Sequence, residues 1–243
     1  AKGVYDNCPN DEAKDIFNIP AWLNKMVENN WLGDKTGQGF FKKVKTPEGK
    51  SDIQVLNLQT MEYTARQRPK FATLEAAKPI EDLPARLKIL INGTDKAGEF
   101  YRQFHYSLFS YISHRIPEIS DEVYRLDDAM MAGFGWEIGA FESWDASGLA
   151  KTTEAMKAAG FTVAKWVDDM LAAGHNTFYK VENGKRLYYD VAGKTYKNLP
   201  GGDTFLVMKY FTNQTIWKNS SSRVYHLGDD VLGLEWNTKM NSI

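Results

Sequence analysis

A glycine-rich stretch at residues 34–39, Asp-Lys-Thr-Gly-Gln-Gly, is the first segment of this sequence with residue types suited to ligand contact. Gly37 and Gly39 would let a ligand approach the backbone closely, and Lys35 would supply a positive charge. A phosphate-binding glycine loop follows a strand and opens a helix, whereas this stretch is predicted to follow a helix and open a strand. The pattern therefore favours a tight helix-to-strand turn over a nucleotide site.

Three carboxylates, Glu137, Glu142 and Asp145, lie close together in an aromatic stretch. A pair of carboxylates can divide the acid and base roles of glycoside hydrolysis. The spacing alone is a weak signal, and the aromatic neighbours, Trp144 among them, favour packing in a core or an interface. We therefore interpret Glu142, Trp144 and Asp145 as structural or interface residues.

Asp127 is predicted to lie on nearly the same side of a helix as Val123, among apolar residues. A buried carboxylate without hydrogen-bond donors is energetically costly. We expect Asp127 to be a structural anchor, which either caps a neighbouring helix or pairs with Arg125 or a lysine.

The titratable residues outside these groups give no pattern for catalysis or metal binding. The four histidines, His105, His114, His175 and His226, lack the spacing of metal ligands, and Cys8 is the single cysteine. We therefore predict no metal site, no disulfide and no cysteine nucleophile. The histidines of the long predicted helix are interpreted as packing or surface residues.

The composition limits the partners of the chain. Its 243 residues hold 30 Lys and Arg against 31 Asp and Glu, which gives no electrostatic reason to expect nucleic acid or an anionic membrane. No apolar run is long enough for a membrane span, and one cysteine fits a reducing, cytoplasmic setting. The sequence begins without Met and stops inside a strand-like pattern, so we expect a piece of a longer protein.

Hydrophobic periodicity predicts a mainly α fold with small β-hairpins. In the first part, a short helix over residues 10–17 precedes a helix that Pro20 opens and Gly33 ends, and a strand follows at residues 40–44. Residues 45–95 are interpreted as a connector, with a possible hairpin and a short helix that Asn92 and Gly93 stop. The longest helix is predicted over residues 96–116, with an apolar face formed by Phe100, Phe104, Leu108, Ile112 and Ile116.

Capping and turn residues place the remaining elements. Ser120 is predicted to cap one helix and Ser147 another, while residues 133–148 are interpreted as turn-rich. A further helix is predicted over residues 163–171 by its apolar spacing. Asn183 and Gly184 then join two strands in a hairpin.

Two distant parts of the sequence share a pattern of helix, glycine and aromatic-basic strand. Residues 25–28 match residues 165–168 at an offset of 140, and residues 40–42 match residues 178–180 at an offset of 138. Such long-period similarity indicates a duplicated module with two residues lost from the glycine loop of the second copy.

Four segments of the sequence resemble parts of one protein family. PAWLNKMVENNWLGDKTGQGFFKK resembles the end of the helical C-terminal domain of 3-hydroxyacyl-CoA dehydrogenases, where an LGxKTGxGFY-like segment occurs, and YDNCPNDEAKDIF resembles the approach to it in long members. RIPEISDEVYRLDDAMMAGFGWEIGAFESWDASGL resembles a second, diverged copy of that domain in multifunctional fatty-acid oxidation proteins. VYHLGDDVLGLEWNTKMNSI resembles the first strand of an enoyl-CoA hydratase (crotonase) domain.

The resemblance implies a parent oxidoreductase of fatty-acid β-oxidation, which oxidises 3-hydroxyacyl-CoA with NAD and also hydrates enoyl-CoA. It equally implies that the NAD-binding Rossmann domain and the catalytic residues lie upstream, that the hydratase lies downstream, and that this piece is inactive alone. The family's substrate-contacting Asn stands in a GFxxNR-like helix start, and the corresponding EFYRQFHYSLFSYISHRI lacks it. The substrate-adjacent candidates are then Lys35, Thr36, Gly37, Gln38 and Gly39, which would lie near acyl-CoA.

The expected organisation follows from the same resemblance. Residues 1–44 would be the remnant of a first domain like the C-terminal domain of 6-phosphogluconate dehydrogenase, residues 45–95 a connector, and residues 96–197 a second such domain. Residues 198–243 would be a linker and the first crotonase strand. The expected role is a scaffold that helps form the acyl-CoA cleft, with a second copy replacing the partner subunit of dimeric relatives or with a homodimer still possible. The alternative is an interaction module without an acyl-CoA role.

Overall fold

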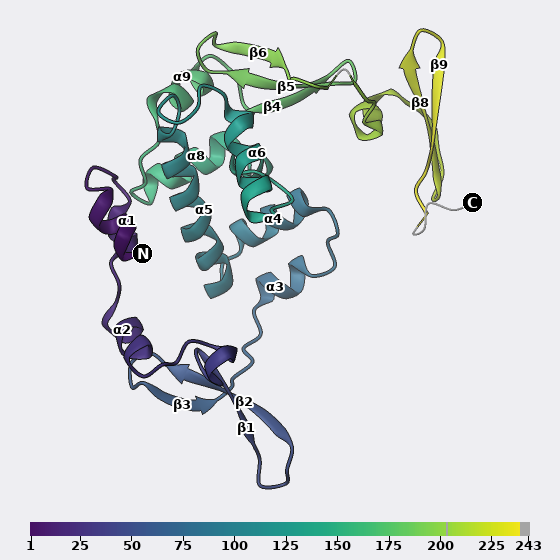
Figure 1. The fold of residues 1–243 in the computed structure, drawn as a ribbon. Helices are drawn as coiled ribbons and strands as arrows, with labels where there is room; N and C mark the ends of the chain where they lie inside the picture. The colour runs from purple at the N-terminus through teal and green to yellow at the C-terminus, as the bar shows by residue number, and fades with distance from the viewer. Residues whose placement is uncertain (203, 239–243) are drawn as a thin grey trace. The chain divides into compact units, whose positions relative to one another are not determined.

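The computed structural model describes residues 1–202 and 204–238, which divide into two compact units, Ala1–Lys70 and Phe71–Ile243. Helices dominate the second unit, and three small antiparallel sheets complete the described chain, so the fold is mainly α (Figure 1). The division at residue 70 separates the predicted connector, residues 45–95, into two parts. Its hairpin belongs to the first unit, and its helices belong to the second.

The first unit consists of short helices followed by one sheet. Its helices are α1 (Lys2–Asn7), a 3₁₀ turn (Lys14–Phe17) and α2 (Ala21–Glu28), and its strands are β1 (Phe41–Lys45), β2 (Ser51–Asn57) and β3 (Glu62–Ala65). The strands pair in the order β1-β2-β3. The helix expected over residues 10–17 is thus a single 3₁₀ turn. Helix α2 ends before the expected Gly33 because Asn30 takes a left-handed conformation, with φ of 57°.

The second unit begins with seven helices. These are α3 (Ala72–Ala77), α4 (Leu83–Asn92), α5 (Lys96–His114), α6 (Val123–Phe134), α7 (Ala140–Ser147), α8 (Leu149–Ala158) and α9 (Lys165–Ala172). Asp95 begins the longest helix, α5, because its carboxylate accepts the Gly98 N–H, and this helix confirms the prediction for residues 96–116 to within two residues.

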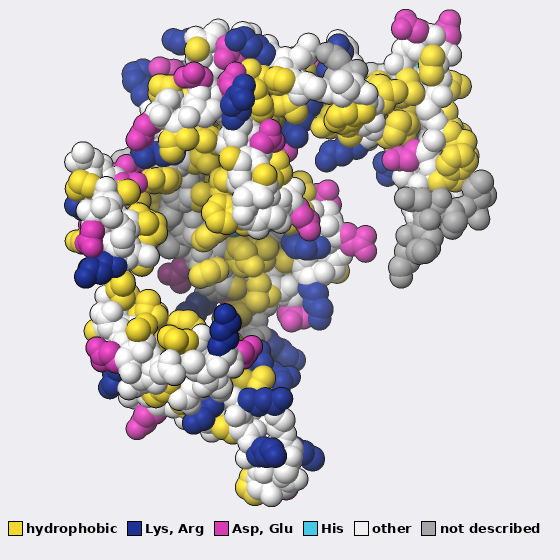
Figure 2. Space-filling model, viewed as in Figure 1, with side chains coloured by type: hydrophobic (Ala, Val, Ile, Leu, Met, Phe, Trp, Pro, Cys, Tyr) yellow, Lys and Arg dark blue, Asp and Glu magenta, His cyan; other side chains and the backbone are white. Residues whose placement is uncertain are grey.

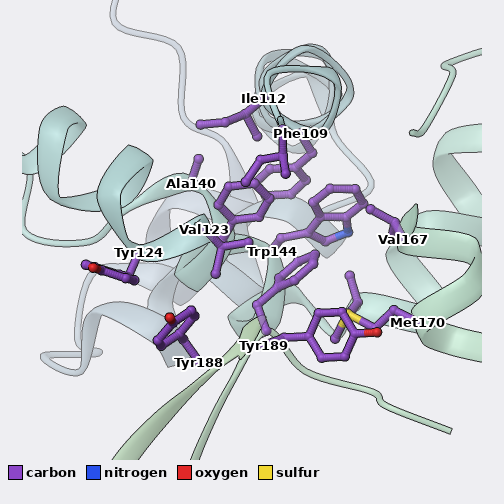
Figure 3. Close-up of a cluster of buried hydrophobic side chains, with 14 of the residues drawn as sticks. Phe109, Ile112, Val123, Tyr124, Ala140, Trp144, Val167, Met170, Tyr188 and Tyr189 are labelled. Atoms are coloured by element: carbon purple, nitrogen blue, oxygen red, sulfur yellow. The ribbon is translucent and has the colours of Figure 1, made fainter. Parts of the chain in front are cut away.

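The core of the second unit lies among α5, α6, α7 and α9 (Figure 3). Its centre is a parallel stack of the Phe109 and Trp144 rings, whose centroids are 5.0 Å apart. Phe178 contacts Trp144 from the start of the following sheet. Aromatic rings therefore join the helices to the sheet, as the aromatic content of the sequence suggests.

The apolar face predicted for α5 is only partly correct. Ile112 is buried, but Phe100 is 67% exposed and Phe104 is 46% exposed. The buried stripe instead includes His105 and Ser113. A buried histidine and serine satisfy their polar atoms on backbone carbonyls of the same helix, so polar residues can hold core positions that a purely apolar pattern overlooks.

Two predicted helix starts are wrong. The residue that precedes α6 is Glu122, and the Ser120 hydroxyl instead accepts the Glu122 N–H within the turn before the helix. Ser147 is the last residue of α7, and Gly148 precedes α8. Residues 133–148 were expected to be turn-rich, but they contain helix α7. The helix has only eight residues and lies between Gly139 and Gly148, so its glycines resemble those of turns.

A second sheet follows α9 and a third closes the described chain. The second consists of β4 (Tyr179–Glu182), β5 (Lys185–Asp190) and β6 (Thr195–Asn198), and the third of β7 (Thr215–Lys218), β8 (Ser222–Gly228) and β9 (Val231–Trp236). Both pair antiparallel in sequence order. The predicted hairpin turn at Asn183 and Gly184 is confirmed, and both residues have positive φ. The stretch expected to hold one crotonase strand holds three strands, and its residues 239–243 lie outside the described part.

Candidate functional site

The glycine-rich loop of the first unit is a closed turn between α2 and β1. A 3₁₀ turn (Asp34–Thr36) forms its first half, and the Gly33 N–H donates to the Gln38 carbonyl at 2.9 Å across its base. Thr36 fastens the loop from inside. Its hydroxyl oxygen accepts the Leu32 N–H at 2.9 Å and lies 3.1 Å from the carbonyl oxygens of Gly33 and Gln38.

Two of the loop glycines are required by the geometry. Gly37 has φ of 77° and ψ of −9°, the left-handed region that favours glycine. A Cβ on Gly39 would lie 2.8 Å from the Gly33 backbone, which a real Cβ cannot do. These glycines therefore shape the turn itself, whatever ligand approaches it.

The five loop candidates differ in what they can offer a ligand. The Thr36 hydroxyl is hydrogen-bonded within the loop, Gly39 is buried, and Gly37 is exposed. Lys35 is also exposed, so its ammonium group can reach a bound anion. The structure thus brings Lys35, Thr36, Gly37, Gln38 and Gly39 together in one turn, with charge contributed by Lys35 alone.

The carboxylate candidates of the second unit meet at the start of the β4–β6 sheet. Asp127, on α6, accepts the N–H groups of Phe141 and Glu142 at 2.9 and 3.1 Å, and therefore caps α7. It also accepts the Tyr179 hydroxyl at 3.0 Å. Of the two roles left open for Asp127, the structure has the helix cap, while Arg125 pairs with Glu122.

Asp145, on α7, makes the corresponding contact with the sheet. Its two carboxylate oxygens accept the N–H groups of Phe178 and Tyr179 at 2.8 and 2.9 Å. The carboxylate thus satisfies two backbone donors where β4 enters the core. Trp144 precedes it on α7 and is fully buried against Phe109 and Phe178.

Glu142 and Arg186 close this network with an ion pair between α7 and β5. Glu142 also accepts the Gly139 N–H, and the Arg186 guanidinium lies 4.3 Å from the Tyr179 ring centroid. Arg186 and Tyr179 are functional partners that the sequence analysis missed, because no spacing rule links a strand arginine to a helix glutamate 44 residues earlier.

Burial dominates the electrostatics of this network. It raises the pKa of Asp127 to about 7 and the pKa of Asp145 to about 8, although the backbone N–H bonds oppose this in both. Burial also raises the pKa of the Tyr179 phenol, with Asp127 adding to the effect, so Tyr179 stays a hydrogen-bond donor. Every candidate carboxylate here is committed to the fold, which leaves no free pair for acid–base chemistry in the network.

Two parts of the chain repeat the same local structure. We call α2, the glycine loop and β1–β3 (residues 20–65) the first module, and α9 with β4–β6 (residues 164–198) the second module. The last turn of each helix contains a buried methionine whose carbonyl accepts the N–H of the residue five positions later. The Trp31 N–H donates to Met26 at 2.8 Å, and the His175 N–H donates to Met170 at 3.1 Å.

The start of the sheet is also repeated. The Trp22 ring contacts Phe40 at 5.9 Å, and the Trp166 ring contacts Phe178 at 5.7 Å. In both modules, the carbonyl of this phenylalanine accepts an N–H from the second strand. Each third strand then supplies a tyrosine, Tyr63 or Tyr196, that donates its hydroxyl to the backbone carbonyl just before that phenylalanine and carries a lysine over its ring.

These contacts correct the register expected for the repeat. The helices align at an offset of 144, as from Trp22 to Trp166, and the strands at the expected 138, from Phe40 to Phe178. The connection is therefore six residues shorter in the second module, where two were expected. Residues 25–28 and 165–168 therefore occupy positions that differ by one turn within their own helices. The second module lacks the loop that holds Lys35 in the first module.

The described residues also bear on the expected cofactor and metal. They hold no cluster of His, Cys, Asp or Glu suited to a metal ion. A dinucleotide site of the Rossmann type is built on parallel strands joined by a helix, whereas every strand pair in residues 1–202 and 204–238 is antiparallel. These described residues therefore do not fit a Rossmann-type NAD site. None of the described helices is long and apolar enough to cross a membrane.

Fold and site together define a mainly helical protein segment with two helix–strand modules, one carrying a glycine loop and the other a buried carboxylate network. A Bacillus subtilis protein with the name "Probable 3-hydroxyacyl-CoA dehydrogenase" is 38% identical over the whole chain, which spans 30% of that protein. Two proteins provisionally named fatty acid oxidation complex trifunctional enzymes are 25% identical in Rickettsia felis and 24% identical in Rickettsia prowazekii. They match 55% and 54% of the chain, which spans 17% of each.

Two other comparisons gave no match. No family model matches the chain. No solved structure matches it. The chain thus spans less than a third of the length of the curated relatives that it matches.

Proposed function

We propose that this chain is the helical, non-catalytic part of a longer NAD-dependent 3-hydroxyacyl-CoA dehydrogenase of fatty-acid β-oxidation. The observation that carries this proposal is the 38% identity that extends over the whole chain to a protein named for that activity. NAD would bind an upstream Rossmann domain, because the described residues do not fit a Rossmann-type NAD site. A hydratase domain would follow downstream, and the whole protein would work in the cytoplasm.

In this proposal the two modules, each the end of a 6-phosphogluconate dehydrogenase-like helical domain, have different tasks. The first module would face acyl-CoA through its loop, where Lys35 is exposed and can contact an anionic group. The second module would be a scaffold, because the start of its sheet is bound to α7 through Asp145, which accepts the N–H groups of Phe178 and Tyr179. The second copy would take the place of a partner subunit, and a homodimer is then unnecessary.

The test uses the full-length protein that contains this chain. Lys35→Ala removes the exposed charge, and Gly39→Ala forces the loop open, since its Cβ would meet Gly33. Both variants should weaken acetoacetyl-CoA binding several-fold in a titration, with thermal stability recorded alongside. Lys50→Ala is the matched control, because Lys50 is an exposed lysine in the turn between β1 and β2 of the same unit.

The competing proposal is an interaction module without an acyl-CoA role, and the internal hydrogen bonding of Thr36 favours it. Unchanged acetoacetyl-CoA affinity in both loop variants would support this alternative. A separate assay addresses catalysis. Reduction of acetoacetyl-CoA by the isolated chain, with oxidation of NADH to NAD, would contradict the assignment of a non-catalytic part.

A further inference from the structure

An apolar pocket of about 340 Å³ lies in the second unit, beside α4, α5 and the segment that leads into α7. Its apolar wall consists of Leu83, Leu87, Phe104, Trp136 and Ile138. Phe104 and Trp136 contact each other with centroids 6.4 Å apart. Figure 2 shows hydrophobic side chains gathered over α4, α5 and α6. This volume is at the small end of the range for ligand pockets.

Two buried polar side chains, His105 and Ser143, also line this pocket. His105 is only 6% exposed, and its Nδ1 lies 2.8 Å from the Tyr101 carbonyl one turn back on α5. That contact requires the ring proton on Nδ1. Burial lowers the pKa of His105, so the ring is neutral and Nε2, which carries no proton in this tautomer, remains a hydrogen-bond acceptor.

Ser143, like His105, can offer the pocket only a hydrogen-bond acceptor. Its hydroxyl proton is donated to the Gly139 carbonyl at 2.7 Å, which leaves the oxygen lone pairs. His105 Nε2 and the Ser143 hydroxyl oxygen are therefore both hydrogen-bond acceptors, because the proton on each side chain is donated to a backbone carbonyl. A ligand carboxylate would face lone pairs here, whereas a hydroxyl or N–H group would find a partner.

The rim of the pocket does not reverse this preference. Arg86 and Glu137 lie there with opposite charges. Arg86 donates its Nε–H to the Ile80 carbonyl at 2.6 Å, and Glu137 is exposed to solvent. Opposite charges in contact with water select weakly for ligand charge.

We propose that this pocket binds a small neutral ligand with an aromatic or otherwise apolar body and one hydroxyl or N–H group, which donates to His105 Nε2. The apolar body packs between Phe104, Trp136 and the leucines of α4. This inference is independent of the dehydrogenase assignment, because it uses only contacts within residues 80–143.

The test compares three probes with one shared body: 4-propylphenol, 4-propylanisole and 4-propylbenzoate. The phenol can donate a hydrogen bond, the anisole cannot, and the benzoate is an anion. Titration of the whole chain, followed by the NMR signal of the Trp136 indole N–H, should show the phenol binding about 3- to 10-fold more tightly than the anisole. The benzoate should bind most weakly.

His105→Phe keeps an aromatic ring and removes the acceptor, so the advantage of the phenol over the anisole should disappear. His114→Phe is the matched control, because His114 lies on the same helix with the same contact to a carbonyl one turn back, at 2.8 Å. Equal binding of phenol and anisole by the unmodified chain, tightest binding of the benzoate, or no saturable binding of any probe would each overturn the proposal. The unmodified chain decides the question even where a variant fails to fold.

Discussion

Phe40 and Phe178 occupy the same place in the two modules, yet they differ in their exposure to solvent. Each lies just before a strand, contacts a tryptophan, and accepts an N–H from the second strand. Phe40 is 47% exposed, whereas Phe178 is fully buried. The internal contacts of the module therefore form whether the phenylalanine is exposed or buried. How much these contacts stabilise the fold depends on whether other helices cover the phenylalanine.

Burial also explains why the second module contacts the carboxylate network of α6 and α7. When Phe178 and the start of β4 enter the core, their N–H groups leave water and need acceptors. Asp145 supplies them, and Asp127 caps the helix that carries Asp145. Loss of the glycine loop brings the helix and the strand of the second module closer in sequence, with six fewer residues between them.

The largest expected effect comes from truncating the two equivalent phenylalanines. Phe178→Ala should cost about 3 to 5 kcal/mol, because a fully buried ring is removed from an aromatic core. Phe40→Ala should cost about 0.5 kcal/mol, as expected for a surface change. Hydrogen exchange of the Tyr189 and Leu56 N–H groups, which bond these two carbonyls, reports each module separately. Similar costs in both modules would contradict the comparison.

Asp145→Asn should produce the next largest effect. Asparagine keeps one acceptor oxygen but turns an NH₂ group toward the second backbone donor, which should cost about 1 to 3 kcal/mol. Asp168→Asn is the control, because Asp168 is half-exposed and pairs with Lys157, so it should change stability by less than about 1 kcal/mol. Urea denaturation followed by near-ultraviolet circular dichroism measures both. Equal costs would mean that Asp145 is no more important than a surface carboxylate.

A smaller net effect should appear as pH dependence of the second module. The pKa of Asp127 is about 7 and that of Asp145 about 8 in the fold, against 3.8 for an ordinary aspartate. Between these values the folded chain holds protons that the unfolded chain has released, so the free energy of unfolding should fall as pH rises from about 4 to 8. It should then level off.

The Asp145→Asn variant removes the contribution of Asp145 together with its electrostatic coupling to Asp127, whose charge adds to the raised pKa of Asp145. The difference in unfolding free energy between the variant and the unmodified chain should change with pH over the same window. A contribution from Asp145 that instead increases with rising pH would show that its hydrogen bonds outweigh its burial.

The smallest expected effect tests the equivalence of the modules. Tyr63→Phe and Tyr196→Phe each remove a hydroxyl that donates to a backbone carbonyl, at 2.6 Å to Gly39 and at 2.5 Å to Thr177. Each should cost about 1 kcal/mol, with the same hydrogen-exchange measurement as the readout. Clearly unequal costs would indicate that the two tyrosines do not have equivalent roles.

The sequence predicted the elements whose structure depends on neighbouring residues in the chain. The Asn183–Gly184 turn and the long helix α5 followed from backbone preference and periodicity. The glycine loop was correctly expected to join a helix to a strand. Its closed geometry depends on Thr36, whose role cannot be inferred from residue type alone.

Helix α7 and the register of the repeat depend on tertiary contacts, and the sequence pattern did not predict them. Helix α7 is held by burial of Trp144 and by the Asp127 cap from another helix, and neither leaves a periodic signature in eight residues. The helices of the repeat align at an offset of 144 rather than the expected 140. The sequence does not distinguish these offsets, because a shift of four residues along a helix keeps the same face. Shared contacts at Met26 and Met170 fix the register, and these appear only in the folded chain.

The stacked pair of Trp144 and Phe109 has an optical consequence. Trp144 is fully buried, its ring plane is 2° from that of Phe109, and its indole N–H has no hydrogen-bond partner among the residues the structure describes. An indole in such surroundings emits at shorter wavelength than a solvated one such as Trp217, which is half-exposed. The blue edge of the tryptophan emission is therefore a built-in signal of whether the helical core of the second unit is intact.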